Sequence, residues 1–233
     1  MRTLTGTSGF SYPEWSGSFY PEDLPAKERL SHYAGRLDAV EINNTFYRMP
    51  SRSLLQSWAS KVPADFRFAL KAPQRITHVS RLKAESAPAV AYFYDAASVL
   101  GQRLGPVLFQ LPPNLKRDVP RLEAFLALLP SSGRAAFEFR HPSWLDEEVF
   151  AALRKGGAAL CIAEAEGLAA PLVPTAPWGY LRLRLPDYDE EALRAWAEKI
   201  RSQPWREVYA FFKHEDGAKG PVFARRLSEL LLP

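Results

Sequence analysis

The sequence of 233 residues contains a single cysteine, Cys161, so no disulfide bond can form within the chain. Cys161 lies in the apolar run 158–163, where a small buried hydrophobic residue is expected. No stretch approaches the length of about 18 apolar residues that a membrane-spanning helix needs. The first residues, 1–6, lack the apolar core of a signal peptide. These absences predict a protein of a reducing, cytoplasmic compartment with no membrane association.

Basic clusters and glycine-rich phosphate loops are missing as well. The net charge is +4, but no run of five or more basic residues marks a nucleic-acid-binding tail. The turn at residues 6–12 lacks the G-x-G-x-x-G spacing, and no Walker-type lysine follows it, which argues against nucleotide binding. With only four histidines, we predict no bound metal and no cofactor. The basic balance favours an anionic small molecule as the partner, with nucleic acid as the alternative. It does not indicate an oligomeric state.

Strand-like and helix-like segments alternate along the whole chain. Strand candidates begin near residues 3, 38, 66, 107, 134, 158, 180 and 207, about 29 residues apart, as repeated βα units require. Helical patterns occupy residues 51–61, 85–103, 118–129, 146–155, 189–202 and 219–232. The sixth connection, 165–178, contains three prolines and is expected to lack a full helix. This order predicts an α/β fold, a compact TIM-type (β/α)8 barrel in one domain spanning 1–233. An open doubly wound sheet is the alternative.

Several hydrophobic runs end in charged or amide side chains, although a buried strand tolerates lone charges poorly. Because alternate residues of a strand point to opposite faces, large apolar residues are assigned to the helix side and polar ones to the barrel interior. Small or apolar residues are expected beneath as a packed plug, namely Ala39, Ala69, Leu108 and Ala136. The carboxyl ends of the strands, where barrels of this kind hold their active sites, form what we call the mouth.

The predicted site consists of residues at this mouth. Candidate catalytic residues are Glu41 and Glu138 as acid and base, Lys71 as nucleophile or charge-stabilising group, and His141 as proton shuttle. Candidate substrate-binding residues are Ser8, Asn43, Tyr47, His78, Gln110, Arg140, Trp144, Glu164, Arg182, Arg184 and Lys213. Five positive and three negative side chains leave an excess of about two positive charges, which a bound anion would relieve. The alternative is an ion-pair network that only holds the barrel together.

Motifs along essentially the whole chain resemble those of one family, the domain-of-unknown-function 72 (DUF72), or YecE-like, family. The matching segments are 6–12, 40–47, 68–71, 104–106, 110–113 and 138–144, together with Trp15, Gly17, Phe19, Tyr20, Pro21 and His78. The resemblance implies a TIM-barrel fold and leaves the activity open. Many relatives carry arginine-x-histidine-glycine on the seventh strand, where this chain has Arg182-Leu-Arg184-Leu185, and asparagines after the eighth, where it has 211–216. Both departures add positive charge near the mouth and put in doubt a role for a strand-seven histidine.

Four activities are compatible with these residues. The favoured one is an enzyme (a hydrolase, lyase or isomerase) acting on a phosphate- or carboxylate-bearing small molecule, with the mouth arginines as an anion clamp. The second is a nucleic-acid-binding or phosphodiester-cleaving barrel. Its aromatic residues would stack on bases, namely Phe10, Tyr12, Trp15, Tyr47 and Trp144. A glycosidase with two glutamates ranks lowest, because an arginine excess is unusual for a neutral sugar. A non-catalytic anion-binding module is the remaining alternative.

Overall fold

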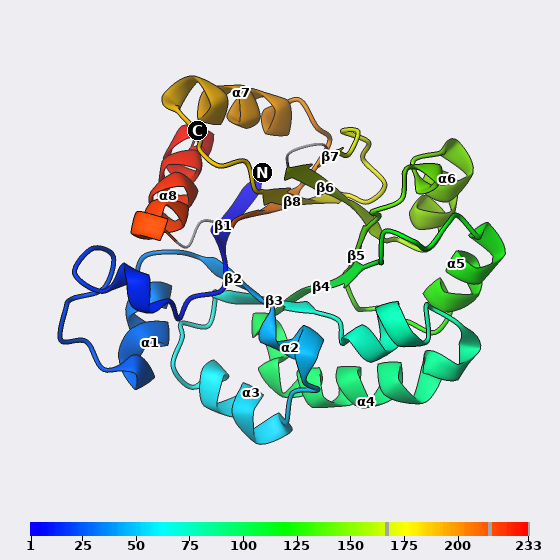
Figure 1. Ribbon diagram of the computed structural model, residues 1–233, viewed down its shortest axis with the longest axis horizontal. Helices are drawn as coiled ribbons and strands as arrows, with labels where there is room; N and C mark the ends of the chain where they lie inside the picture. Colours follow the sequence, from blue (N-terminus) through cyan, green and yellow to red (C-terminus); the bar gives the residue numbers. More distant parts are fainter. Residues whose placement is uncertain (166–167, 214–215, 233) are drawn as a thin grey trace.

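The computed structural model describes residues 1–165, 168–213 and 216–232, and these form a closed ring of eight parallel strands with helices outside it (Figure 1). The barrel strands are β1 Arg2–Ser8, β2 Ala39–Ile42, β3 Arg67–Lys71, β4 Leu104–Gln110, β5 Ala135–Glu138, β6 Ala159–Ala165, β8 Trp178–Leu183 and β9 Glu207–Phe212. Each strand pairs with its neighbours in chain order, and pairing of β9 with β1 closes the ring. The predicted barrel is confirmed, and every strand begins within three residues of its predicted start.

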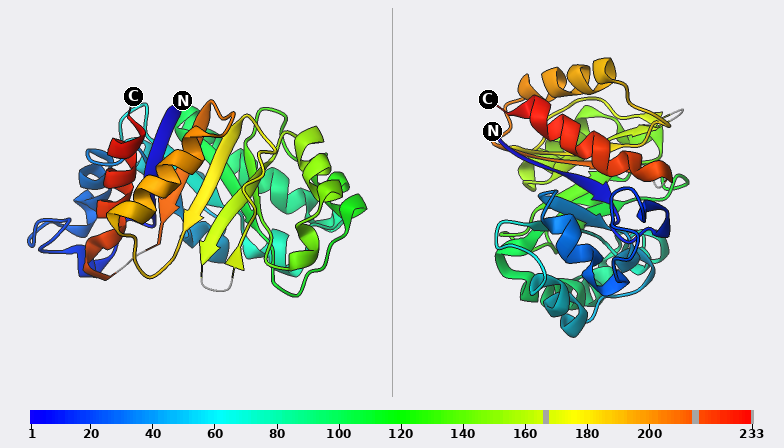
Figure 2. Two further views of the ribbon diagram at one scale, coloured as in Figure 1. Left: turned by 90° about the horizontal axis from the view of Figure 1, so that it is seen from above. Right: turned by 90° about the vertical axis from the view of Figure 1, so that its left-hand side faces the viewer.

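The helices cover the outside of the ring, as the side views show (Figure 2). They are α1 Arg29–Ala34, α2 Asn44–Tyr47, α3 Arg52–Ala59, α4 Ala87–Ala97, α5 Val119–Leu126, α6 Glu147–Lys155, α7 Glu190–Arg201 and α8 Lys219–Leu231. The predicted helix 85–103 divides, because α4 ends at Ala97 and the chain continues as a 3-10 segment at Ser98–Arg103, in which Gly101 adopts a non-helical φ of 53°. Helices α1 and α2 were not predicted. Among the described residues, none of the helices is long and apolar enough to cross a lipid bilayer.

The connection between β6 and β8 is the degenerate one that the three prolines predicted. A short strand, β7 (Leu168–Ala169), pairs antiparallel with β6. No helix occurs between residues 168 and 178. Proline restricts φ and lacks a backbone donor, so this segment cannot complete the hydrogen bonds of a helix.

Apolar side chains fill the barrel interior below the mouth. The four residues predicted to form the plug are all buried there, together with Leu4, Ala159, Cys161, Ala163, Trp178, Tyr180, Tyr209 and Phe211. Small alanines on β2, β3, β5 and β6 leave volume that the aromatic residues of β8 and β9 occupy, so the interior is a packed core. Cys161 is buried as expected, and burial raises the pKa of its thiol.

Two glycines of β1 and its turn let the first two strands approach closely. A Cβ on Gly6 would lie 1.8 Å from the carbonyl oxygen of Ala39. Gly9 adopts φ 101°, which L-residues rarely adopt, and its N–H donates to the carbonyl oxygen of Glu41 at 2.8 Å. This close pairing brings the side chain of Ser8 against that of Glu41 at the end of β2.

Candidate functional site

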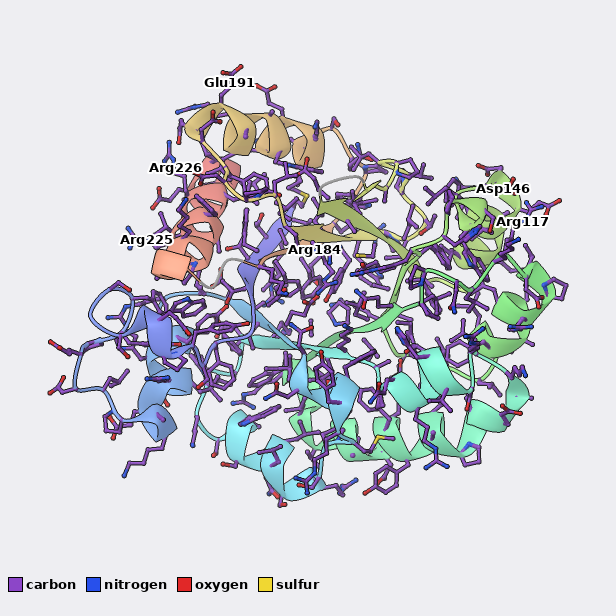
Figure 3. The ribbon with its side chains drawn as sticks, viewed as in Figure 1. Arg117, Asp146, Arg184, Glu191, Arg225 and Arg226 are labelled. Carbon is purple, nitrogen blue, oxygen red and sulfur yellow. The ribbon has the colours of Figure 1, made fainter. Side chains whose placement is uncertain are left out.

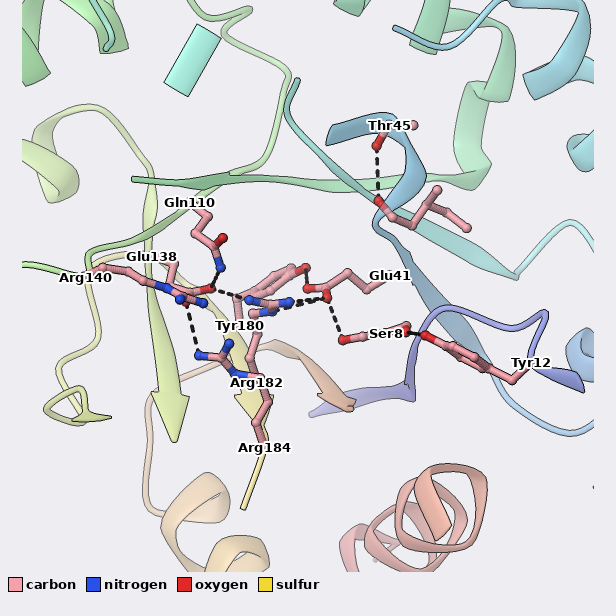
Figure 4. A network of polar contacts seen from close by, with 11 residues as sticks. Ser8, Tyr12, Glu41, Thr45, Gln110, Glu138, Arg140, Tyr180, Arg182 and Arg184 are labelled. Atoms are coloured by element: carbon pink, nitrogen blue, oxygen red, sulfur yellow. Dashed lines mark hydrogen bonds and ion pairs between the residues drawn. The ribbon is translucent and has the colours of Figure 1, made fainter. Parts of the chain in front are cut away.

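The polar strand ends meet inside the ring of strands. Figure 3 places Arg184 there, apart from Arg117 and Arg226 at the periphery of the molecule. The side chains that converge come from β1, β2, β4, β5 and β8, five strands far apart in sequence (Figure 4). The strand alternation predicted this convergence.

Glu41 of β2 is fully buried and accepts hydrogen bonds from side chains of two other strands, β1 and β8. Its Oε1 accepts from Ser8 Oγ at 2.6 Å and from Arg182 Nη2 at 2.8 Å, and its Oε2 accepts from Tyr180 Oη at 2.7 Å. Burial alone would raise the pKa of Glu41, but the Arg182 guanidinium and these hydrogen bonds outweigh it and lower the pKa. The carboxylate is therefore ionised at neutral pH.

Hydrogen-bond donors from four side chains surround the carboxylate of Glu138 on β5. Its Oε2 accepts from Arg182 Nη1 at 2.5 Å and from Gln110 Nε2 at 2.9 Å. Its Oε1 accepts from Arg140 Nε at 2.9 Å and from Arg184 Nη2 at 3.2 Å. Burial would raise the pKa of Glu138, but the three guanidinium groups, Arg182 foremost, lower it to about 2.

Arg182 joins the two glutamates. It is 2% exposed, and its Nε, Nη1 and Nη2 all donate to the carboxylates of Glu41 and Glu138. Burial would lower the pKa of Arg182, but the two carboxylates raise it above its usual value. This part of the mouth is an ion-pair network that links β2, β5 and β8. A network of this kind was the alternative to a ligand site, so part of that alternative is present.

The network does not balance in charge. Arg182, Arg140, Arg184 and Lys71 give four positive groups against the two glutamates, an excess of two. The sequence predicted the same excess from a larger set, which also counted Lys213 and Glu164. Arg184 Nε is buried and has no hydrogen-bond partner in the described residues. Arg140, with its side chain 33% exposed, connects the network to solvent.

Lys71 forms a second group with Phe46 and His78. The residue is 9% exposed, and its Nζ lies 4.1 Å from the centroid of the Phe46 ring. Burial, followed by the charge of Arg182, lowers the pKa of Lys71 to about 8. The His78 ring packs edge-on against the same Phe46 ring with a centroid distance of 4.9 Å. Burial and then the Lys71 charge lower the pKa of His78.

The predicted orientation of Glu164 is wrong. Glu164 points away from the interior, because its Oε2 accepts from Trp196 Nε1 of α7 at 3.0 Å and from Tyr188 Oη at 2.8 Å. The interior positions of β6 are instead the apolar ones, Ala159, Cys161 and Ala163. Lys213 follows β9, two residues after the interior Phe211, and its side chain is exposed to solvent.

Four other predicted residues lie around the mouth or behind it. Trp144 is fully buried, and its Nε1 donates to the carbonyl oxygen of Leu115 at 2.7 Å, so it does not face a ligand. His141 Nδ1 accepts from Ser143 N at 3.1 Å and caps a 3-10 turn. Tyr47 is 72% exposed at the end of α2. Asn43 lies at a small hollow of about 130 Å³ beside the turn after β1.

The aromatic residues expected to stack on bases are mostly packed. Trp15 is fully buried, like Trp144, and Phe10 and Tyr12 are partly buried against the outer core. Tyr47 is the exposed exception among the five. The described residues contain no group of three histidine, cysteine, aspartate or glutamate side chains placed to hold a metal ion.

Sequence reasoning missed Tyr180, whose hydroxyl donates to Glu41. It lies two positions before Arg182 on β8, and residues two apart on a strand share a face. That spacing could have identified it as an interior residue with a polar tip.

The fold and the site define a (β/α)8-barrel protein with a buried arginine–glutamate network and excess positive charge at the carboxyl ends of its strands. The profile of the family described as "Protein of unknown function DUF72" matches residues 4–233. The chain belongs to this family, as its motifs indicated.

Among curated proteins, the UPF0759 protein YecE of Escherichia coli (strain K12) is 34% identical over 116 residues. That match covers 49% of this chain and 42% of the relative, so the chain matches less than half the length of the curated relative. A solved DUF72 family protein of Thermotoga maritima MSB8 has a TM-score of 0.82 and 26% identity, with 99% of each chain covered. Another, of Enterococcus faecalis V583, has a TM-score of 0.80 and 18% identity, covering 98% of this chain and 95% of its own. The latter likeness concerns the fold alone.

Proposed function

We propose that this protein is an enzyme that acts on a phosphate- or carboxylate-bearing small molecule at the mouth of the barrel. The observation that carries the proposal is the excess of two positive charges around Glu41 and Glu138. Excess charge in a poorly solvated site is costly unless a counterion compensates it. An anionic ligand would supply that compensation.

The arginines divide into two roles in this proposal. Arg182 has its donors engaged by both glutamates and ties the strands together. Within the described residues, Arg140 and Arg184 each donate one hydrogen bond to Glu138 Oε1 and keep further N–H donors. The planar guanidinium fork suits the oxygen atoms of phosphate and carboxylate groups. We therefore assign the anion to Arg140 and Arg184, with Lys71 beside it.

The proton-transfer roles change from those expected from the sequence. An efficient acid or base has a pKa near the working pH. Glu138 has a pKa of about 2 and is a weak base, and Glu41 is likewise lowered. Lys71, with a pKa of about 8, and His78, with a neutral ring favoured by burial, are better matched to neutral pH. We propose that the glutamates position the arginines while Lys71 and His78 exchange protons.

Thermal unfolding with added inorganic phosphate and small phosphorylated compounds tests the anion site. Ligands that bind the folded state raise the melting temperature as their concentration increases. We expect Arg184→Gln to lose most of this rise, whereas Arg225→Gln on the exposed surface of α8 should keep it (Figure 3). An equal response of the two variants, or no response of the unaltered protein to any of these anions, would contradict the proposal.

A further inference from the structure

Lys71 differs from every other lysine of the chain. The other eight lysines have exposed side chains. Lys71 ends β3 at the mouth and is 9% exposed, with its amino group against the Phe46 ring. An amine in this position is shielded from bulk water, and the charges of Arg182 and of Arg140, one of the two proposed anion-binding arginines, act on it.

Lys71 also lacks a counterion. Within the described residues no carboxylate oxygen lies within 4.0 Å of its Nζ, whereas Glu41 and Glu138 are fully engaged by the arginines, Ser8, Tyr180 and Gln110. A buried ammonium group without a partner is unfavourable relative to the neutral amine. The contact with Phe46 offsets part of this cost. A neutral amine is the nucleophilic form.

We propose that Lys71 forms an imine with the carbonyl carbon of a substrate that is an aldehyde or ketone bearing a phosphate or carboxylate group. This inference rests on the proposed function, because Arg140 and Arg184 would hold the anionic group while the carbonyl group reaches Lys71. It narrows the substrate class from anions in general to anionic carbonyl compounds.

The chemical step is balanced without any oxidant or reductant. The Lys71 nitrogen forms a bond to the carbonyl carbon, and the electron pair of the broken C=O π bond moves to the oxygen, which takes up a proton. The nitrogen then loses a proton, and the carbon–oxygen bond breaks with departure of water, which leaves a C=N bond. His78, packed on the same Phe46 ring and held toward its neutral form, is suited to carry the proton from nitrogen to the leaving oxygen.

Reductive trapping tests the imine directly. The intact protein is mixed with equimolar pyridoxal 5′-phosphate or with glycolaldehyde phosphate, a smaller aldehyde for a narrow mouth. It is then reduced with sodium borohydride and mapped by peptide mass spectrometry. We expect a single major adduct at Lys71. Pyridoxal and glycolaldehyde lack the phosphate group. The extent of Lys71 labelling by them should be lower by at least roughly tenfold, since the charge-assisted hydrogen bonds to the anion are lost.

Two variants control the assignment. Lys71→Met should give no major adduct. Lys155→Met, which removes an exposed lysine, should form the Lys71 adduct to the same extent as the unaltered protein. Adducts confined to exposed lysines, or none, would overturn the imine inference. If phosphate still raised the melting temperature in that case, the proposed anion site would stand. Equal labelling of Lys71 by aldehydes with and without phosphate would overturn the anionic substrate class.

Discussion

Replacing Lys71 with methionine is expected to stabilise the folded protein at neutral pH. The pKa of Lys71 falls from 10.5 to about 8 in the folded state. Each pKa unit corresponds to about 1.4 kcal/mol, so holding the charged amine in place costs about 3 kcal/mol. Methionine keeps the apolar stem but loses the contact with Phe46, worth about 1 kcal/mol. The net gain in the free energy of unfolding should be about 2 kcal/mol.

The gain should depend on pH with a definite sign. Below pH 8 the lysine is protonated in both the folded and unfolded states, so its cost is fully present. Between pH 8 and 10.5 the unfolded chain binds more protons than the folded protein, and the stability of the lysine form therefore rises toward that of the methionine form. Urea unfolding of both proteins at pH 7 and above pH 10 measures this difference.

Lys155→Met serves as the matched control. Lys155 is exposed and pairs loosely with Glu123 at 3.4 Å, so its replacement should change the stability by less than about 1 kcal/mol at either pH. A loss of stability in Lys71→Met at pH 7, or a gain that stays the same above pH 10, would refute the account of Lys71 as an uncompensated buried amine.

Two further predictions concern the network itself. Arg182→Met leaves Glu41 and Glu138 buried with part of their charge uncompensated. It should lower the free energy of unfolding by about 3–5 kcal/mol in urea titrations. The control Arg117→Met, which breaks an exposed pair with Asp146, should lower it by less than about 1 kcal/mol. Glu138, with its pKa lowered from 4.5 to about 2, contributes stability that is present above pH 4.5 and is lost as the pH falls toward 2. Glu138→Gln should therefore show a shallower decline of stability across this acid range than the unaltered protein, and an identical decline would contradict the assignment.

The fold could be predicted because the same strand-then-helix pattern recurs along the sequence. Each βα unit carries an apolar strand pattern followed by a helical one, and the regular spacing of eight such units favours a closed parallel barrel. The carboxyl-end charges on β2, β3, β5 and β8 were assigned to the correct face because large apolar residues alternate with them. On β8, for example, Leu181 and Leu183 face the helices on either side of Arg182.

The alternation of apolar and polar residues does not identify the interior face of β6. The interior residues Cys161 and Ala163 and the outward residue Ile162 are all apolar, so alternation does not distinguish the two faces of this strand. Glu164 was assigned inward by the same reasoning as the polar ends of the other strands. It points outward because Tyr188 and Trp196, 24 and 32 residues further along the chain, supply its donors. Partners at that separation leave no local pattern in the sequence.

The ion-pair network and the proposed ligand site both lie at the mouth of the barrel, and their arginines differ in how deeply they are buried. Arg182, at 2% exposure, satisfies one oxygen atom of each glutamate and would be sufficient to link β2, β5 and β8. A network that served only to join strands would gain nothing from further cations, because each uncompensated buried charge destabilises the fold. Arg140 and Arg184 nevertheless lie above it, 33% and 14% exposed. Their place between the buried network and solvent is the reason for assigning them to an anion that enters from outside.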